Sequence, residues 1–541
     1  MLNVLFDTTG VGVRDGHPTK PGDMSADEMT LAHVLEANAF KYGNRIGYVQ
    51  AERSLTHRQY LARARRLADG LYQRNARSQD RIAVLSMNCL EYLEAYGACE
   101  VSGFIITTVN YRLAAPEMLS ILTDAAPKVL IFESRYLALV DQLRTGLPDV
   151  DCYVCIGGSA PVWALDYESL IDSGSPAGPP IRPRASQVAH LIYTSGTTGR
   201  PKGCMLGHRQ LVDKAQLHAG DMDPRPEDRL LIVMPLFHVG ARGVVGAAQW
   251  RGAAIYLLRS FEPERYLNAL AEQGITMAHL APTMVKDVLD HELVRTLDLS
   301  RLRLICYSAA PMPLPTLRRG LELLGPVFHQ SYGQTEGMVS SLLRSQHLPD
   351  GNETEKGWLL SVGQPYPRTE VRIVDDDGNP VAIGSVGEIT YRGPFMFSGY
   401  WNDSVSTLAT IRDGWVHSGD IGRLDDGGFL YIVDRKKDMI VSGGENIYSR
   451  DVEDALLKHE FISEAAVIGI PDARWGEAVH AYVVCPVQRV LTQDDVIEHC
   501  RSLIASYKRP RSATFVEALP RTANGKVDKR ALRLRHSEGR S

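Results

Sequence analysis

The sequence predicts an α/β protein, with a large N-terminal part made of several lobes and a small α+β unit at the C-terminal end. Apolar strings alternate with helical periodicities from about residue 54 to residue 134, which is typical of a largely parallel sheet. Beyond Gly363 the pattern changes to short alternating strands joined by Asp/Gly turns. The last hundred residues change again, to a mixture of helices and strands. We therefore expect two α/β lobes, a β-rich lobe and a compact terminal unit.

The first lobe is predicted to follow an irregular segment that ends near Met24. Five residues share one stripe at helical spacing and predict a helix: Tyr60, Leu61, Ala64, Leu67 and Leu71. Further helices are expected around residues 89–102 and from about Pro116. Three apolar strings between these helices are predicted strands: RIAVLSM (81–87), FIITTVN (104–110) and VLIFES (129–134).

A segment rich in Pro, Gly and Ser, residues 172–186, indicates an exposed connection to a second α/β block from about 188 to 345. The terminal unit is predicted to contain, in order, a helix at 451–459, strands at 465–471 and 478–485, a helix at 494–504 and a strand at 513–519. We interpret the basic tail that starts at Lys529 as a solvated end of the chain.

Composition excludes several classes of protein. The 59 basic and 64 acidic residues among 541 give a net charge of −5, which does not favour a nucleic-acid partner. Eight cysteines are too few for a disulfide framework, and the pair Cys152 and Cys155 lacks the second pair of ligands that a zinc site needs. No signal peptide and no run of 18 apolar residues is present. The expectation is a cytoplasmic protein without a transmembrane segment.

The most informative segment is HLIYTSGTTGRPKGCML, residues 190–206. An apolar strand ends at Tyr193 and leads directly into a run of hydroxyl residues and glycines that is followed by Lys202. Glycines let backbone N–H groups face inward, hydroxyls add donors, and a lysine adds charge, so the pattern indicates a cradle for phosphate. The segment is not a Walker A loop, because Lys202 follows Pro201 and precedes Gly203.

The loop YTSGTTGRPKG resembles the signature loop of the acyl-adenylate-forming (AMP-binding) superfamily, in its acyl-CoA synthetase branch. Five further strings follow in the order that the family has them: PLFHVG (235–240), SYGQTEG (331–337), GWVHSGD (414–420), DRKKDMIVSGGENI (434–447) and PRTANGK (520–526). The resemblance covers almost the whole chain. It implies an N-terminal AMP-binding domain over residues 1–434 and a mobile C-terminal domain over residues 435–541, with a hinge at about Lys437.

The resemblance also implies the residues of an ATP/AMP site. They are Thr194, Ser195, Gly196, Thr197, Thr198, Gly199, Lys202, Ser308, Ala309, Ala310, Pro311, Gln330, Tyr332, Gly333, Asp420 and Arg435. The residue types suit these roles, because Tyr332 offers a flat face to a purine and Asp420 can accept hydrogen bonds from ribose hydroxyls. On the residues alone, Asp420 could equally be a loop carboxylate or a helix cap.

Four residues are expected to be catalytic by resemblance: Lys526, Thr335, Glu336 and His238. Lys526 would bridge the substrate carboxylate and the α-phosphate, where a cation offsets the repulsion between two anions. Thr335 offers a hydroxyl to a phosphate, and Glu336 is a hard oxygen ligand suited to Mg²⁺. His238 would gate the acyl pocket from the CoA tunnel, although it could also be a core histidine. The expected CoA-binding residues are Gly443, Gly444 and Glu445.

The acyl pocket is expected to be lined by Phe237, Gly240, Ala241, Met284 and Met338. The small residues among them leave room for an aryl, branched or longer aliphatic acid. The string PLFHVG contains no aspartate, which amino-acid-activating relatives use to pair with the substrate amine, so a simple carboxylic acid is preferred. Arg242 could bind a second carboxylate if it pointed inward, but we interpret it as a surface arginine.

The resemblance thus implies an ATP-dependent acyl-CoA synthetase that converts a fatty or aryl acid to acyl-AMP and then transfers the acyl group to CoA, with Mg²⁺ as cofactor. Its C-terminal domain would swing about Lys437 between the two steps. The alternative is a standalone ligase that loads a separate carrier protein, because only fifteen residues follow Lys526 and no carrier domain is among them. Whether the enzyme forms a homodimer is left open.

Overall fold

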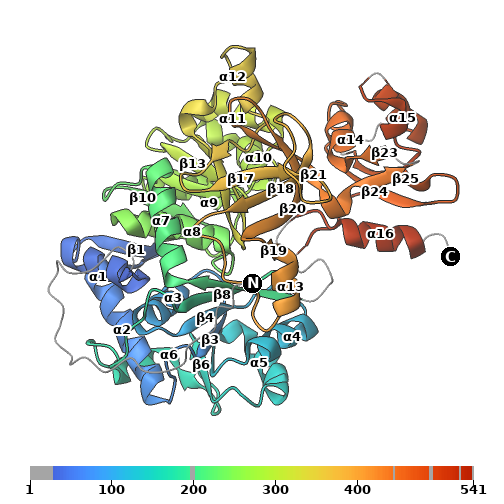
Figure 1. The fold of residues 1–541 in the computed structure, drawn as a ribbon. Helices are drawn as coiled ribbons and strands as arrows, with labels where there is room; N and C mark the ends of the chain where they lie inside the picture. The colour runs from blue at the N-terminus through green and yellow to red at the C-terminus, as the bar shows by residue number, and fades with distance from the viewer. Residues whose placement is uncertain are drawn as a thin grey trace.

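Four β-sheets organise the chain in the computed structural model, which describes residues 28–194, 201–442, 445–485, 491–501, 503–522 and 526–538. Figure 1 shows the two largest sheets, each accompanied by helices, with the last segment of the chain set to one side beside α16. The expected α/β fold, with a large N-terminal part and a small C-terminal part, is confirmed.

The first sheet has seven strands in the order β7-β6-β5-β3-β4-β8-β9. They are β3 (Arg81–Leu85), β4 (Ile105–Thr108), β5 (Val129–Glu133), β6 (Cys152–Ile156), β7 (Leu165–Asp166), β8 (Val188–Thr194) and β9 (Lys202–Gly207). All neighbours are parallel except β8 and β9. The helices of this lobe are α2 (His57–Gln73), α3 (Leu90–Ser102), α4 (Ala115–Ala125), α5 (Leu137–Leu143) and α6 (Tyr167–Ser173).

The second sheet has nine strands in the order β16-β15-β14-β13-β12-β10-β11-β1-β2. They are β1 (Ile46–Gln50), β2 (Arg53–Thr56), β10 (Arg229–Ile232), β11 (Ala254–Leu257), β12 (Met277–Leu280), β13 (Leu304–Tyr307), β14 (Phe328–Gln334), β15 (Gly337–Leu342) and β16 (Gln364–Pro365). Its helices are α1 (Leu31–Lys41), α7 (His208–Met222), α8 (Val239–Arg251), α9 (Pro263–Glu272), α10 (Pro282–Asp290), α11 (Leu314–Leu324) and α12 (Glu353–Trp358).

The boundary predicted between the two α/β lobes is wrong. The strands β8 and β9, which follow the Pro-rich connection at 172–186, complete the first sheet through the parallel pairing of β8 with β4. Conversely, β1 lies near the N-terminus but pairs in parallel with β11 of the second sheet. Each lobe is therefore built from segments that are distant in sequence.

The third sheet is the predicted β-rich lobe, and its paired strands are antiparallel. It contains β17 (Glu370–Val374), β18 (Gly387–Arg392), β19 (Ile411–Arg412), β20 (Trp415–Leu424) and β21 (Leu430–Arg435), with α13 (Ser404–Thr410) beside it. The fourth sheet contains β22 (Ile440–Ser442), β23 (Glu445–Ile447), β24 (Glu464–Asp472), β25 (Gly476–Val484) and β26 (Ser512–Phe515). Its helices are α14 (Ser449–Leu456), α15 (Gln493–Arg501) and α16 (Lys529–Glu538).

The helix α16 corrects the interpretation of the basic tail as a solvated end. Its residue Leu532 is fully buried in an apolar cluster with Ile468 and Ile470 of β24. Lys529, at the start of the helix, forms an ion pair of 2.8 Å with Glu453 of α14. One apolar anchor and its ion pairs hold the helix against the fourth sheet.

All eight cysteines are free thiols, and Cys152 and Cys155 are buried on β6. Within the described segments no group of three or more His, Cys, Asp or Glu side chains is arranged to hold a metal ion. None of the helices in these segments has the length and apolar composition needed to cross a bilayer.

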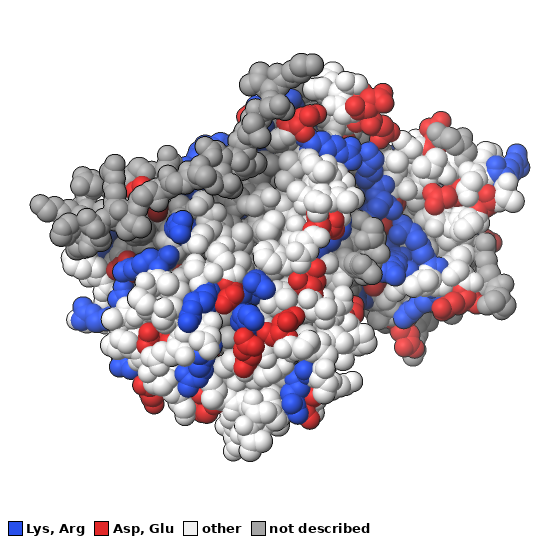
Figure 2. All heavy atoms as spheres, turned by 60° about the horizontal axis from the view of Figure 1, so that its bottom comes forward, with Lys and Arg blue, Asp and Glu red and all other residues white. Residues whose placement is uncertain are grey.

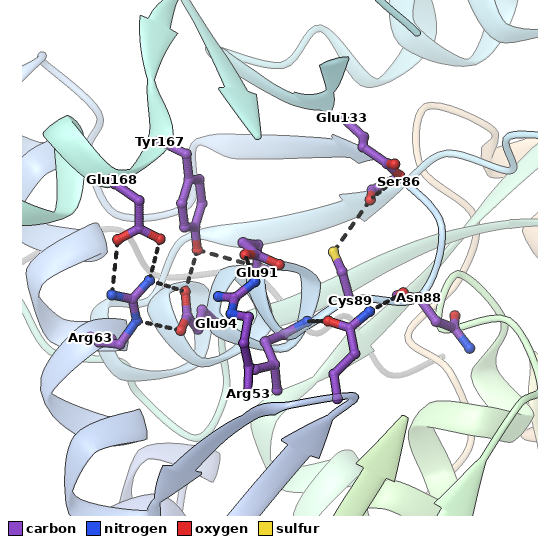
Figure 3. Close-up of polar contacts among 12 residues, drawn as sticks. Arg53, Arg63, Ser86, Asn88, Cys89, Glu91, Glu94, Glu133, Tyr167 and Glu168 are labelled. Carbon is purple, nitrogen blue, oxygen red and sulfur yellow. Dashed lines mark hydrogen bonds and ion pairs between the residues drawn. The ribbon is translucent and has the colours of Figure 1, made fainter. Parts of the chain in front are cut away.

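The helix α3 is buried along its whole length, although it carries several carboxylates. Figure 3 shows Arg63 of α2 lying between Glu94 of α3 and Glu168 of α6. Glu94 accepts hydrogen bonds from Arg63 Nε at 2.5 Å and from the Tyr167 hydroxyl at 2.8 Å. Burial raises the pKa of Glu94, and the Arg63 guanidinium opposes this effect. Through its two ion pairs, Arg63 joins α2 to α3 and α6.

We expect Glu94→Ala to lower the free energy of unfolding by about 3–5 kcal/mol, because it removes one partner of a buried ion pair. The matched control is Glu168→Ala, which removes the other carboxylate on Arg63. Glu168 is 53% exposed, so its loss should cost about 0–1 kcal/mol. Urea denaturation of both variants measures the difference, and equal effects would contradict the assignment.

Candidate functional site

The candidate site lies where four neighbouring parallel strands of the nine-stranded sheet end. In open α/β sheets, ligands bind in the crevice outside the carboxyl ends of the strands. The segments that follow these ends contain most of the predicted site residues outside the β8–β9 loop: His238 after β10, Met284 after β12, Ser308 after β13 and the Tyr332–Glu336 segment at the end of β14.

Asp420 connects this edge to the β-rich lobe. Its carboxylate is 5% exposed and accepts hydrogen bonds from the Tyr332 hydroxyl at 2.7 Å and from Gln334 Nε2 at 3.2 Å. Arg435 lies opposite Asp420 in the pairing of β20 with β21, and its Nε is 3.4 Å from Asp420 Oδ1. The predicted residues Tyr332, Asp420 and Arg435 are therefore in contact. Gln334, which the sequence reasoning did not assign, belongs to the same group.

Glu336 lies at the turn between β14 and β15. Its Oε1 accepts a hydrogen bond from the Tyr400 hydroxyl at 2.6 Å, and its backbone carbonyl accepts one from the Phe397 N–H at 2.8 Å. Lys202 Nζ lies 5.0 Å from the centre of the Tyr400 ring. Thr194 pairs with Lys202 across β8 and β9, so both ends of the predicted phosphate loop reach this position. The predicted residues Ser195, Gly196, Thr197, Thr198 and Gly199 lie outside the described residues.

The predicted adenine wall follows β13. Ser308 Oγ lies 2.9 Å from Nε2 of His279, and Ala309 has a φ of +75°, a left-handed conformation that costs a residue with a Cβ about 1–2 kcal/mol. Ala310 is partly exposed, and Pro311 and Gly333 are exposed. Gln330 differs from these residues, because it is buried and its Oε1 accepts a hydrogen bond from Tyr307 at 3.2 Å.

Lys526 of the C-terminal part reaches the same group of residues. Loss of solvation lowers the pKa of its ammonium to about 8, and the positive charge of Arg435 adds to this effect. Asp420 and Glu336 oppose it, so both carboxylates act on the Lys526 charge. The string PRTANGK, which contains Lys526, therefore meets the strings SYGQTEG and GWVHSGD, which contain Glu336 and Asp420, at one site.

The predicted hinge residue lies between two anchored neighbours. Lys436 forms ion pairs with Asp376 at 3.0 Å and Glu388 at 3.2 Å, both in the β-rich lobe. Asp438 instead pairs with Arg533 of α16 at 3.1 Å. For Lys437, between them, the described segments contain no ion pair, and burial lowers the pKa of its amine. Ionic contacts thus change from one part of the molecule to the other across Lys437.

Basic side chains gather at this junction. Figure 2 shows a band of Lys and Arg where the C-terminal part meets the large body. Asp434, just before the predicted hinge, accepts hydrogen bonds from the backbone N–H and the hydroxyl of Ser449 in α14. Of the predicted CoA-binding residues, Glu445 is exposed on β23, whereas Gly443 and Gly444 lie outside the described residues.

The comparisons with known proteins agree with this geometry. The family model of the AMP-binding enzyme matches residues 35–401, and the model of the AMP-binding enzyme C-terminal domain matches residues 451–526. The chain belongs to the AMP-binding enzyme family. It is 36% identical to a feruloyl-CoA synthase of Amycolatopsis sp., over 89% of this chain and 94% of the relative.

Two further relatives show the range of this family. A fatty acid–[acyl-carrier-protein] ligase, ScoC of Streptomyces coeruleorubidus, is 33% identical over 89% of this chain and 92% of its own. The crystal structure of the anthranilate CoA ligase AuaEII in complex with anthranoyl-AMP superposes with a TM-score of 0.87 at 25% identity, covering 96% and 99% of the two chains. The protein is an AMP-forming ligase of the acyl-CoA ligase branch.

The predicted acyl-pocket residues of this AMP-binding enzyme fall into two groups. Phe237 and Ala241 belong to the main hydrophobic core, and the Phe237 ring lies 5.3 Å from that of Tyr111 in an edge-on arrangement. Met338 is buried in a small cluster with Leu217, Tyr366 and Phe395, while Met284 is partly buried. Gly240 is the open position, because a Cβ there would lie 3.6 Å from the His279 ring and 3.9 Å from Ser308 Oγ.

His238 lies at the start of α8, directly after Phe237. Its ring centre is 4.3 Å from that of Phe237, and its carbonyl accepts a hydrogen bond from the Arg242 N–H at 3.2 Å. The side chain is half-buried. This position, on the carboxyl side of β10 and next to Gly240, is compatible with the expected gate.

The interpretation of Arg242 as a surface residue is wrong. The side chain is 4% exposed and binds Glu100 Oε1 of α3 at 2.5 Å, and His190 of β8 lies 2.9 Å from the same oxygen. Arg242 can be buried because the Glu100 carboxylate compensates its charge. It is therefore not available to bind a second carboxylate of a substrate.

The sequence reasoning also missed Lys214 and His218, which lie on the buried face of α7 beside Gly243 of α8. Their spacing of four residues, together with Leu211 and Ala215, is the helical periodicity that could have identified them. Tyr400, the partner of Glu336, carried no comparable signal.

We expect Gly337→Ala to destabilise the hairpin that carries Glu336. A Cβ at Gly337 would lie 2.6 Å from Cε2 of Tyr391, which is fully buried, so the free energy of unfolding should fall by about 1–3 kcal/mol. Thermal unfolding measures the effect. The control is Gly357→Ala, where no atom lies within 4 Å of the new Cβ, and an equal loss in both variants would contradict the steric explanation.

Proposed function

We propose that this enzyme activates an aryl, arylalkanoic or fatty acid as acyl-AMP and transfers the acyl group to CoA, with the predicted site residues in the roles described below. The observation that supports the proposal most is the meeting of Lys526, Arg435, Asp420 and Glu336 at the carboxyl ends of the parallel strands. This arrangement offers positive charge to phosphates beside an acceptor for ribose hydroxyls.

In the first step a carboxylate oxygen of the acid attacks the α-phosphorus of ATP. The bond between the α-phosphorus and the bridging oxygen of the β-phosphate breaks, and pyrophosphate leaves with the electron pair. Lys526 offsets the repulsion between the carboxylate and the α-phosphate, and Thr335 and the segment from Thr194 to Lys202 bind phosphate oxygens. Tyr332 and Ser308–Pro311 hold the adenine, while Asp420 and Arg435 hold the ribose.

The residues present fit a role for Mg²⁺. Magnesium usually takes one or two carboxylates and completes its shell with phosphate oxygens and water. Glu336 is only partly buried, and the Tyr400 hydroxyl holds its Oε1, so the carboxylate is fixed in position while part of it stays open to a cation. Bound there, Mg²⁺ would neutralise charge on the phosphates.

In the second step the thiol sulfur of CoA attacks the acyl carbon. The carbon–oxygen bond to the phosphate breaks, AMP leaves, and the thiol proton is released. The C-terminal domain, from Arg435 onward, would turn about Lys437, withdrawing Lys526 and bringing Gly443, Gly444 and Glu445 to the site. His238 would admit the pantetheine to the acyl pocket.

A second candidate function is a standalone ligase that delivers the acyl group to a carrier protein. The similarity to the carrier-protein ligase ScoC favours it. AMP release that depends on added CoA distinguishes the two functions. A carrier-protein ligase would form acyl-AMP but would not release AMP when CoA is added. We favour CoA because of the similarity to the feruloyl-CoA synthase over more than nine-tenths of that relative.

Lys526→Ala should reduce acid-dependent ATP–pyrophosphate exchange by at least about 100-fold, because it removes the cation at the reacting phosphate. Thioester formation from supplied acyl-AMP should remain largely intact. The control is Arg530→Ala, an exposed cation four residues further on, which should leave both reactions unchanged. Normal exchange in the Lys526 variant would remove Lys526 from the mechanism.

Lys437→Pro should leave adenylation active and slow thioester formation by at least about tenfold, because proline restricts the backbone rotation that a hinge needs. Lys437→Ala keeps that freedom and serves as the control. Single-turnover assays that follow acyl-AMP and then thioester separate the two steps. If both variants form thioester at the wild-type rate, the hinge lies elsewhere.

A further inference from the structure

Lys214 is a buried cation without a counter-ion in the described part of the chain. It lies on α7 and is 8% exposed. Burial lowers the pKa of its amine to about 8, and the neighbouring Arg242 adds to this effect. No carboxylate acts on it among the described residues. At neutral pH most of the protein molecules therefore carry an unbalanced charge at this position.

The groups around Lys214 do not balance its charge. Arg242 of α8 is positive and is already paired with Glu100. His218, one turn along α7, is neutral, because burial and then the Lys214 charge hold its pKa well below the usual range. An isolated buried ammonium is costly, and proteins retain one where it meets a partner that is absent from the chain itself.

The position of Lys214 connects it with the acyl side of the site. A Cβ on Gly243 of α8 would lie 3.1 Å from Lys214 Cε and 3.3 Å from His218 Cε1. Gly240, next to His279 and Ser308, precedes Gly243 on the same helix by about 4.5 Å of axial rise. The two glycines are three residues apart, so the Lys214 side chain packs against α8 less than one turn from the position that faces His279 and Ser308.

A second contact leads to the same place from the nucleotide side. His218 Nε2 lies 3.4 Å from Oγ of Ser331, which also accepts a hydrogen bond from the Tyr366 hydroxyl at 2.9 Å. Ser331 precedes Tyr332, the residue bonded to Asp420. His218 thus contacts the strand that carries the predicted adenine residue, and Lys214 lies about one turn away from it on the same helix.

We propose that Lys214, assisted by His218, determines specificity by binding an acceptor oxygen at the far end of the acyl substrate. This inference rests on the proposed function. The chemistry shared by the suitable substrates is a carbonyl, hydroxyl or carboxylate oxygen remote from the reacting carboxylate. A second carboxylate is the strongest form, because it supplies the missing charge as well as a hydrogen bond.

The test compares acids that differ only at the far end, on two scaffolds. One series is 3-phenylpropanoate and its 4-acetyl, 4-hydroxy and 4-carboxy derivatives, and the other is octanoate, 7-oxooctanoate and octanedioate. The readout is the ratio of kcat/KM for the oxygenated acid to that for its parent, in acid-dependent ATP–pyrophosphate exchange. Ratios cancel any general loss of activity.

We expect the wild-type enzyme to favour at least one oxygenated acid by about tenfold or more, the worth of one charge-assisted hydrogen bond. Lys214→Met, of similar length without the charge, should reduce that ratio at least about tenfold, and Lys214→Arg should restore most of it. The wild-type preference should also decline above pH 8, as the amine loses its proton, and this dependence should be absent in Lys214→Met. The control is Gln216→Ala, an exposed residue of the same helix.

An unchanged ratio in Lys214→Met, or no preference in the wild type, would overturn the proposal. If Lys214→Met does not fold, as judged by thermal unfolding, an unchanged ratio in Lys214→Gln would overturn it equally. Failure of the proposed function is a different result, because then no acid of either series supports exchange in the wild type. A difference between the acetyl, hydroxy and carboxy acids identifies the form of oxygen that the site binds.

Discussion

The rest of the site depends on one buried charge, the carboxylate of Glu100. It lies on α3, which is buried on every side, and it meets Arg242 of α8 and His190 of β8. Burial alone would raise the pKa of Glu100, but Arg242 and His190 hold it below the usual range. Since β8 leads into the predicted phosphate loop and α8 carries predicted acyl-pocket residues, one ionised carboxylate holds the two elements relative to each other. Removing either partner would cost more free energy than the intact pair contributes, because the other charge would stay buried without compensation. This one arrangement is therefore favoured over others.

The buried charges of the protein are of two kinds, those paired within the chain and those without an ion pair in the described segments. Glu94 and Glu100 are satisfied inside the body by Arg63 and Arg242. Lys526 and Lys214, by contrast, are cations whose pKa values burial lowers, and neither has an ion pair among the described residues. In the roles proposed for these two lysines, a near-neutral chain presents positive charge at two ends of one site without a strong field over its whole surface.

Local patterns predicted the helices and strands, and the motifs predicted which segments meet. The alternation that identified residues 81–134 as strands and helices is local, so the sequence contains it. The pairing of β1 with β11, and of β8 with β4, depends on contacts between distant segments, which no local pattern encodes. Arg242 was misread for a related reason. Arginine is usually exposed, and its burial follows from Glu100, a residue 142 positions away.

The polar contacts near the predicted hinge indicate how the two parts could separate at a small cost in free energy. Lys436 is anchored to the β-rich lobe and Asp438 to α16, so ion pairs on either side of Lys437 would move with their own part. Asp434 is the exception, because it precedes Lys437 and binds Ser449 beyond it. Both residues are buried, and hydrogen bonds to a charged group contribute about 1.5–3 kcal/mol each. A rotation of the C-terminal part must therefore either keep the Asp434–Ser449 contact close to the rotation axis or replace it. Asp434 is close to Lys437 in sequence, which favours a contact that stays near the axis.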